Sequence, residues 1–166
     1  MALASSSFQT PWTDTVVPDT LAGQVTAMTV IDPTENLPTG EVTNLIEVGE
    51  PFVVRLDWKL TGLGTPVVGG FWRVQLYIDD IDGVGPTHGP LGTEAVIPIT
   101  GGVSPLTFSQ RFSIAANAVQ AGLYQLSASI NHSPVNNNAN LLTEMVGFAQ
   151  STPVKFTLTV VESVGA

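Results

Sequence analysis

The residues best placed for chemistry form an acidic group, Asp79, Asp80 and Asp82, which is followed by a glycine. Three carboxylates beside a glycine turn offer the oxygen ligands that Ca²⁺ prefers. An EF-hand loop would need a bidentate carboxylate at its twelfth position, and that position, counted from Asp80, holds Leu91. The sequence therefore leaves two alternatives: a calcium site completed by loop carbonyls or by Glu94, or a solvated acidic turn.

The two histidines, His88 and His132, lie in contexts that do not favour catalysis. A hydrolase needs a histidine beside a nucleophile and an orienting carboxylate. Ser133 follows His132, but adjacent residues at a strand end point apart. The sequence also lacks a Gly-x-Ser-x-Gly elbow and a glycine-rich phosphate loop followed by Lys. We expect both histidines to be surface loop residues, and we expect no catalytic residue and no enzymatic activity.

Paired carboxylates for glycoside hydrolysis must face each other across a cleft. Asp57 lies inside the predicted strand 49–60, and Arg55 and Lys59 flank it on the same face. This arrangement predicts a salt-linked polar surface. Asp57 could take part in glycoside hydrolysis only if this face were buried.

Charge is scarce and acidic in this chain of 166 residues. Charged residues make up 11% of the sequence, compared with about 25% in typical soluble proteins, and the formal net charge is −9. The five basic residues form no cluster, so we expect no nucleic-acid partner and no anionic membrane surface. No apolar run approaches the roughly 20 residues of a membrane span, so we expect no membrane insertion.

The chain contains no cysteine, which excludes disulfides, thiol catalysis and zinc–thiolate sites. A surface rich in Thr, Ser, Asn and Gln favours an extracellular or surface assembly. The first residues, however, lack the basic start and the apolar length of a secretory signal. Localisation therefore stays open at this stage.

A stretch of strict alternation at 49–60 predicts a central strand. Side chains of one parity are polar or charged apart from a valine, and those of the other parity are apolar: Phe52, Val54, Leu56, Trp58 and Leu60. A period of two over nine residues is typical of a half-buried strand. We expect this apolar face to form the core together with Trp72, Leu76, Phe108, Tyr124 and Phe156.

Further strands are predicted where alternating segments are bounded by Gly, Pro and Asn. They cover residues 24–32, 71–79, 94–100, 106–114, 124–131 and 154–162, with a brief edge strand over 42–48. The long interruption at 131–153 either has a function or contains a short hairpin. About seven strands without sustained helical periodicity predict an all-β, antiparallel two-layer β-sandwich.

Two segments resemble a known fold family. Residues 119–128, Val-Gln-Ala-Gly-Leu-Tyr-Gln-Leu-Ser-Ala, are similar to the start of the penultimate strand in immunoglobulin-like and fibronectin-type sandwiches, and residues 49–54 are similar to the second strand of bacterial adhesion-related domains. The resemblance covers roughly 24–162 and implies that Tyr124 makes the tyrosine-corner hydrogen bond. Trp58 and Trp72 compete for the position of the core tryptophan.

Residues 1–23 show no sustained period and predict an extended N-terminal arm, with a single β-sandwich domain over 24–166. The arm carries the large side chains Phe8, Trp12, Val16 and Val17, which we expect to form an assembly interface. They dock either on a neighbouring subunit or on their own domain. Trp12 is also the tryptophan free to act at a surface, since the other two have core parity.

These features favour a structural role. The first hypothesis is a self-associating, homo-oligomeric subunit of a filament, shell or surface layer, since neutral Thr- and Ser-rich sheet edges are open to strand addition. The alternative is an extracellular recognition module for a glycan or protein ligand that uses the loops 79–92 and 131–153. No cofactor is expected apart from calcium.

Overall fold

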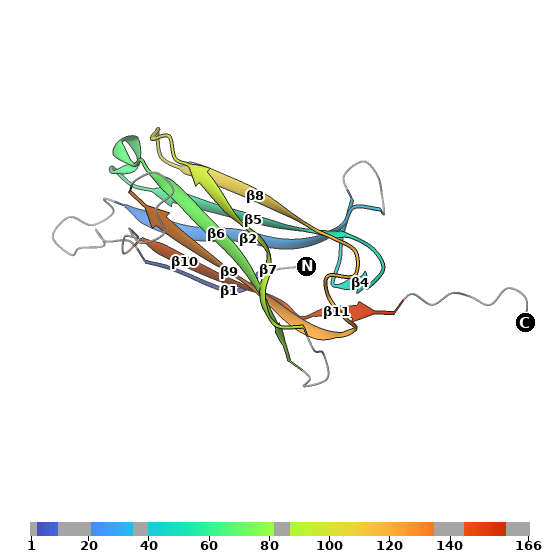
Figure 1. The fold of residues 1–166 in the computed structure, drawn as a ribbon. Coiled ribbons are helices and arrows are strands. Elements are labelled where there is room, and N and C mark those ends of the chain that lie inside the picture. Colours follow the sequence, from blue (N-terminus) through green and yellow to red (C-terminus); the bar gives the residue numbers. More distant parts are fainter. Residues whose placement is uncertain (1–2, 10–20, 35–39, 82–86, 135–144, 159–166) are drawn as a thin grey trace, which may run out of the picture.

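The computed structural model describes residues 3–9, 21–34, 40–81, 87–134 and 145–158. Two β-sheets pack face to face, and Figure 1 shows β2, β5 and β8 in one layer and β1, β6, β9 and β10 in the other. The predicted all-β, antiparallel two-layer sandwich is confirmed. No helix in the described part of the chain is long and apolar enough to cross a membrane.

The smaller sheet has the strand order β3-β2-β5-β8. Its strands are β3 (Glu41–Val42), β2 (Ala22–Asp32), β5 (Phe52–Thr61) and β8 (Leu106–Ile114). Strand β5 is antiparallel to both β2 and β8. The alternating segment predicted to be a central strand therefore does lie at the centre of its sheet.

The larger sheet is organised around β9, which pairs with β6 on one side and with β10 and β11 at successive positions on the other. Beyond β6 the next strand is β7, and beyond β10 the next strand is β1. Strand β4 pairs parallel with β11. The seven strands are β1 (Leu3–Gln9), β4 (Leu45–Glu47), β6 (Phe71–Asp80), β7 (Gly89–Pro98), β9 (Gly122–Ser133), β10 (Val146–Ser151) and β11 (Val154–Thr157).

The core between the sheets is centred on two tryptophans in edge contact. The rings of Trp58 and Trp72 are 6.1 Å apart, and Phe108 stacks on Trp58 at 5.6 Å. Of the residues expected in the core, Phe108 is partly buried and the others are fully buried. Because each fully buried large apolar side chain contributes about 1.5–3 kcal/mol, this layer supplies most of the driving force for folding.

The inward face of β2 changes parity part-way along the strand. A register shift between Val25 and Ala27 inserts one extra residue opposite β5. Val25 is buried before the shift, and Met28 and Val30 are buried after it. The single alternation expected over 24–32 is therefore wrong, because a β-bulge reverses the facing of every residue beyond it.

Three segments differ from the expected strands. Residues 42–48 are divided between the two sheets as parts of β3 and β4. Strand β7 begins at Gly89, inside the region expected to be a loop. Strand β10 lies within 131–153 and pairs antiparallel with β9, so this interruption contributes a strand to the larger sheet.

The N-terminal segment is partly a strand of the chain's own sheet. Residues 3–9 form β1, which pairs antiparallel with β10. Residues 3–9 of the predicted arm are thus an extended strand that docks on the chain's own domain, because β10 offers these residues a free strand edge. Of the arm residues singled out, Phe8 is described, whereas Trp12, Val16 and Val17 lie outside the described residues.

Candidate functional site

The candidate site is the outer face of the larger sheet, where strand register brings polar and aromatic side chains into rows. Ser5 on β1 lies opposite Gln150 on β10, Gln150 lies opposite Ser127 on β9, and Ser127 lies opposite Tyr77 on β6. The alternation of each strand directs these side chains away from the core. The row therefore crosses four strands on one surface.

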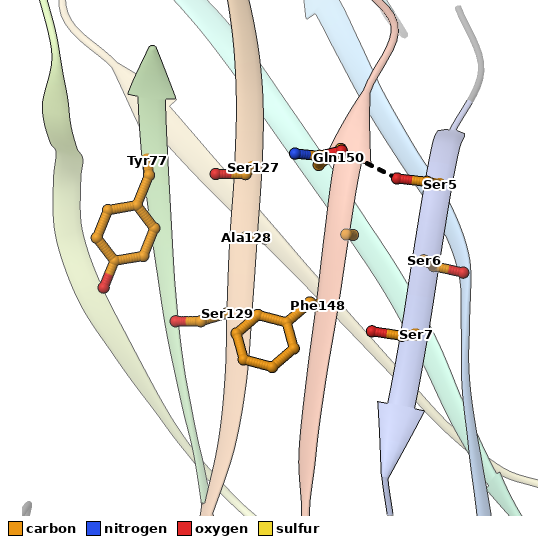
Figure 2. Close-up of a pocket in the computed structure, with 10 residues that line it drawn as sticks. Ser5, Ser6, Ser7, Tyr77, Ser127, Ala128, Ser129, Phe148 and Gln150 are labelled. Atoms are coloured by element: carbon orange, nitrogen blue, oxygen red, sulfur yellow. Dashed lines mark hydrogen bonds between the residues drawn. The ribbon is translucent and has the colours of Figure 1, made fainter.

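A second row lies two residues along the strands. Ser7 is opposite Phe148, Phe148 is opposite Ser129, and Ser129 is opposite Gln75. Strands in a sheet are about 4.8 Å apart, so Tyr77 and Phe148 come from strands about 10 Å apart, with β9 between them. Figure 2 shows the Ser129 side chain between the two rings.

The two rows form a shallow groove with a volume of about 590 Å³. Tyr77 is 38% exposed and Phe148 is 51% exposed, which is high for aromatic residues inside strands. The lining residues are Ser5, Ser6, Ser7, Tyr77, Ser127, Ala128, Ser129, Phe148, Ala149 and Gln150. None of these carries a charge at neutral pH.

One hydrogen bond orients the polar part of the groove. Ser5 Oγ donates to Gln150 Oε1 at 3.1 Å, so the amide NH₂ of Gln150 is directed away from β1 (Figure 2). Exposed rings with hydroxyl and amide groups between them can stack on a neutral ring and hydrogen-bond to it. No carboxylate or imidazole lines this groove in the described part of the chain, so the arrangement suits binding.

A second feature lies where β1 meets the other sheet. Phe8 is opposite Gly147 of β10, and its ring also covers Gly23 of β2. A Cβ atom at Gly23 would lie 2.1 Å from Phe8 Cδ1, and one at Gly147 would lie 2.5 Å from Phe8 Cε2. The ring meets Trp72 edge-on at 6.0 Å. The two glycines therefore form a socket, hereafter the Phe8 socket, that fixes the position of β1.

The acidic group is only partly described. Asp79 is exposed and Asp80 is half-buried at the end of β6, whereas Asp82 lies outside the described residues. Among the described residues, no group of three or more His, Asp or Glu side chains could hold a metal ion. The calcium site at Asp79, Asp80 and Asp82 stays a prediction.

The two histidines differ in their surroundings. His88 is exposed, as expected. His132 is buried, and its Nε2 donates a hydrogen bond to the Gly69 carbonyl at 2.6 Å. Its ring also meets Trp72 edge-on at 5.7 Å. The expectation of a surface loop residue was wrong for His132, because β9 continues through it and its parity directs it into the core.

Tyr124 occupies the position that the resemblance assigns to a tyrosine corner, but it does not make the implied hydrogen bond. Its ring is fully buried and packs edge-on against Phe156 at 5.6 Å. No hydrogen-bond partner of Tyr124 Oη occurs among the described residues. Tyr124 therefore acts here as a packing residue.

The outer face of the smaller sheet is salt-linked, as predicted. Arg55 Nε lies 3.2 Å from a carboxylate oxygen of Asp57. The residue opposite Asp57 on β8 is Ser109, so no second carboxylate faces it from that strand. The structure thus confirms the predicted pairing for Arg55 and Asp57, whereas no ion pair of Lys59 occurs among the described residues.

The sequence interpretation named the segment 131–153, which contains Phe148, Ala149 and Gln150, as a contact surface, but it missed the other residues of the groove. Tyr77 had a detectable signal, since it is an aromatic residue at an outward position of the strand 71–79. Phe148 lies in a segment that was assigned to a loop, so its place on a strand opposite Ser129 was not predicted. The serines gained significance only through pairing with neighbouring strands.

Solved structures share this architecture. The chain is similar to the C-terminal domain of Wzt, with a TM-score of 0.55, 11% identity, and coverage of 83% of this chain and 75% of that one. The fold is immunoglobulin-like. At this identity the similarity shows the fold alone. The sequence matches no protein-family model and no curated protein.

Two further solved structures align with lower TM-scores. The CARDB domain of a protein from Pyrococcus furiosus aligns with a TM-score of 0.48 and 14% identity, over 85% of this chain and 97% of that one. A β-glucosidase from Listeria innocua aligns with a TM-score of 0.45 and 11% identity, over 86% of this chain. This chain spans 17% of that enzyme's length.

Proposed function

We propose that this chain is a non-enzymatic structural subunit that self-associates by placing its β1 strand on the sheet of a neighbouring copy. The Phe8 socket supports the proposal. It is a docking position defined by two glycines on separate strands and filled by one ring from the first strand. Such a position accepts a strand in one register, which is what an ordered assembly requires.

The contacts that hold β1 on its own sheet are the contacts that would hold it on the sheet of a neighbouring copy. Strand β1 pairs with β10 alone among the described strands, and eleven residues of sequence, 10–20, separate it from the start of the next described segment. Exchange of an identical element between protomers is a low-cost route to oligomers, because no new interface has to evolve. Backbone pairing supplies affinity in such strand additions, and side-chain pockets supply specificity.

Engineered cysteines distinguish exchange from internal docking, because the chain contains no cysteine of its own. Ser5 and Gln150 are opposite each other and in side-chain contact. We expect Ser5→Cys and Gln150→Cys molecules, refolded together and mildly oxidised, to form a disulfide-linked heterodimer that mass spectrometry identifies. Ser113→Cys, on β8 of the other sheet, replaces Gln150→Cys in the control mixture.

The double variant completes this experiment. If β1 docks only on its own sheet, Ser5→Cys/Gln150→Cys chains form an internal disulfide and remain monomeric. A mixture of single variants that yields no more heterodimer than the Ser113→Cys control would refute the proposal. Light scattering of the unmodified protein supplies the oligomeric state without any substitution.

A second candidate function is recognition of a neutral glycan by the groove on the larger sheet. Its support is the pair of exposed rings, Tyr77 and Phe148, beside uncharged hydroxyl and amide groups. Of the loops expected to form such a surface, residues 82–86 and 135–144 lie outside the described residues, so their contribution stays a prediction.

A glycan array tests this candidate, followed by titration with any sugar that binds. Loss of one stacking ring costs about 1–2 kcal/mol, so we expect Tyr77→Ala and Phe148→Ala each to weaken binding about tenfold. Leu63→Ala, at a residue 84% exposed outside the groove, is the matched control. Equal loss in the control, or no binding by the unmodified protein, would exclude the candidate.

A further inference from the structure

Positive charge is concentrated on one face of this acidic protein. Three of its five basic residues, Arg55, Lys59 and Arg111, project from the outer face of the smaller sheet. Asp57 is the one acidic residue on β5 and β8. A chain with a formal net charge of −9 therefore carries a local excess of positive charge on these two strands.

The two arginines are directly opposite each other across β5 and β8. Like charges at opposite positions in a sheet are destabilising. Arg55 is compensated by Asp57, with Nε at 3.2 Å from Oδ2. No ion pair of Arg111 occurs among the described residues. The opposed pair therefore carries more positive charge than Asp57 alone compensates.

The surface beside the arginines is hollowed. A groove of about 690 Å³ contains Arg55 and Arg111 together with Thr29, which lies opposite Arg55 on β2. Its remaining lining residues are Ile31, Gly40, Val42 and Asp57. The groove is large enough for a small ligand and offers a hydroxyl group beside two guanidinium groups.

We infer that Arg55 and Arg111 form a binding site for an oxyanion, a carboxylate or phosphate group of a small ligand. The planar guanidinium group presents parallel N–H donors that match the oxygens of either group. Bound between the two arginines, the anion replaces their mutual repulsion with two attractive contacts. Thr29 lies at the same register position and supplies a hydroxyl donor.

This site is separate from the strand exchange and from the groove on the larger sheet, because it lies on the opposite face of the sandwich. Electrostatic attraction to it acts over about 8 Å at physiological ionic strength. The net negative charge of the rest of the chain opposes anion binding elsewhere. Specific binding of an anion by this protein therefore points to this face.

Thermal melting with added anions tests the inference. The probes are inorganic phosphate and glutarate, each compared with sodium chloride at the same ionic strength, so that screening is matched. A ligand that binds the folded state raises the melting temperature in proportion to the logarithm of its concentration. We expect at least one probe to do so, and the one that acts identifies phosphate or carboxylate as the preferred group.

Arg111→Gln has two expected effects. Without anion it melts at the same temperature as the unmodified protein or higher, because the repulsion is removed. It also weakens anion binding by about tenfold or more, as for the loss of one charge-assisted contact. A variant that merely damages the structure would lower the melting temperature instead.

Two controls complete the test. Lys155→Gln removes the same charge from β11 of the larger sheet and should leave anion binding unchanged. Arg111→Lys keeps the positive charge but loses the parallel N–H donors of the guanidinium group. Its affinity for the anion should therefore lie between the affinities of Arg111→Gln and Lys155→Gln. The inference is overturned if neither probe raises the melting temperature more than sodium chloride does. It is also overturned if Arg111→Gln binds the anion as tightly as the unmodified protein, or if Lys155→Gln loses as much anion affinity as Arg111→Gln.

Discussion

The Phe8 socket allows a quantitative test of how β1 is held. In the structure, the Phe8 ring occupies the volume that a side chain at Gly23 would need, with Cδ1 2.1 Å from the position of a Cβ atom. Gly23→Ala should therefore be costly when Phe8 is present and harmless when it is absent. The perturbation is a double-mutant cycle of Phe8→Ala and Gly23→Ala, which isolates the coupling between the two positions.

The expected energies follow from burial and packing. Complete removal of a buried Phe side chain costs about 3–5 kcal/mol, and Phe8 is partly buried, so we expect Phe8→Ala to cost about 2 kcal/mol. Overpacking costs about 1–3 kcal/mol, which sets the penalty of Gly23→Ala alone. In the Phe8→Ala background that clash disappears, and alanine at position 23 should stabilise the strand by about 0.5–1 kcal/mol relative to glycine. The coupling should therefore be about 2 kcal/mol or more, near the upper end of measured pairs.

Urea unfolding at a fixed protein concentration, followed by tryptophan fluorescence, measures the four free energies of unfolding. Gly69→Ala is the control, since a Cβ atom there would have no neighbour within 4 Å. If Gly23→Ala costs the same with and without Phe8, the ring does not occupy the socket. The reasoning about β1 would then fail.

Three further predictions concern the core and the acidic turn. Tyr124→Phe should leave the free energy of unfolding unchanged or raise it by up to about 1 kcal/mol, because it removes a buried hydroxyl group without a described partner. Urea unfolding measures this change, and a loss of more than about 1 kcal/mol would reveal a hidden hydrogen bond. His132→Ala should cost about 2 kcal/mol, through the lost bond to the Gly69 carbonyl and the lost contact with Trp72, and an unchanged urea midpoint would argue against both contacts. Saturating Ca²⁺ should raise the melting temperature of the unmodified protein but not of Asp80→Asn, whereas calorimetry without heat would dismiss the calcium site.

Period-two patterning predicted the strands that are long and bury one face. It predicted β5 and β6 nearly to the residue, because an alternating apolar face must be buried whichever strands become its neighbours. It failed at Val25 and Ala27, where a bulge reverses the facing of residues, since a bulge depends on the partner strand. It also failed for β1, whose run of serines becomes a strand only because β10 and the Phe8 socket accept it.

The candidate site was harder to predict than the strands, because its residues become neighbours only through the register in which the strands pair. Parity alone places Tyr77 outside, but it does not reveal that Phe148 and Ser129 are opposite each other. His132 was predictable in principle, since it shares the parity of Ile130 and the buried residues before it. The two opposed arginines likewise emerge only when β5 and β8 are aligned.

The composition of the groove on the larger sheet couples two events that are otherwise separate. Ser5, Ser6 and Ser7 of β1 line it, and Ser5 orients Gln150. A ligand held there is bound fully only while β1 is seated. If seating of β1 raises the affinity of the groove for the ligand by some factor, the bound ligand raises the affinity of the sheet for β1 by the same factor, because coupling between two binding events is reciprocal. Occupancy of the groove would then be measurable as tighter equilibrium binding of the strand, whichever molecule contributes it.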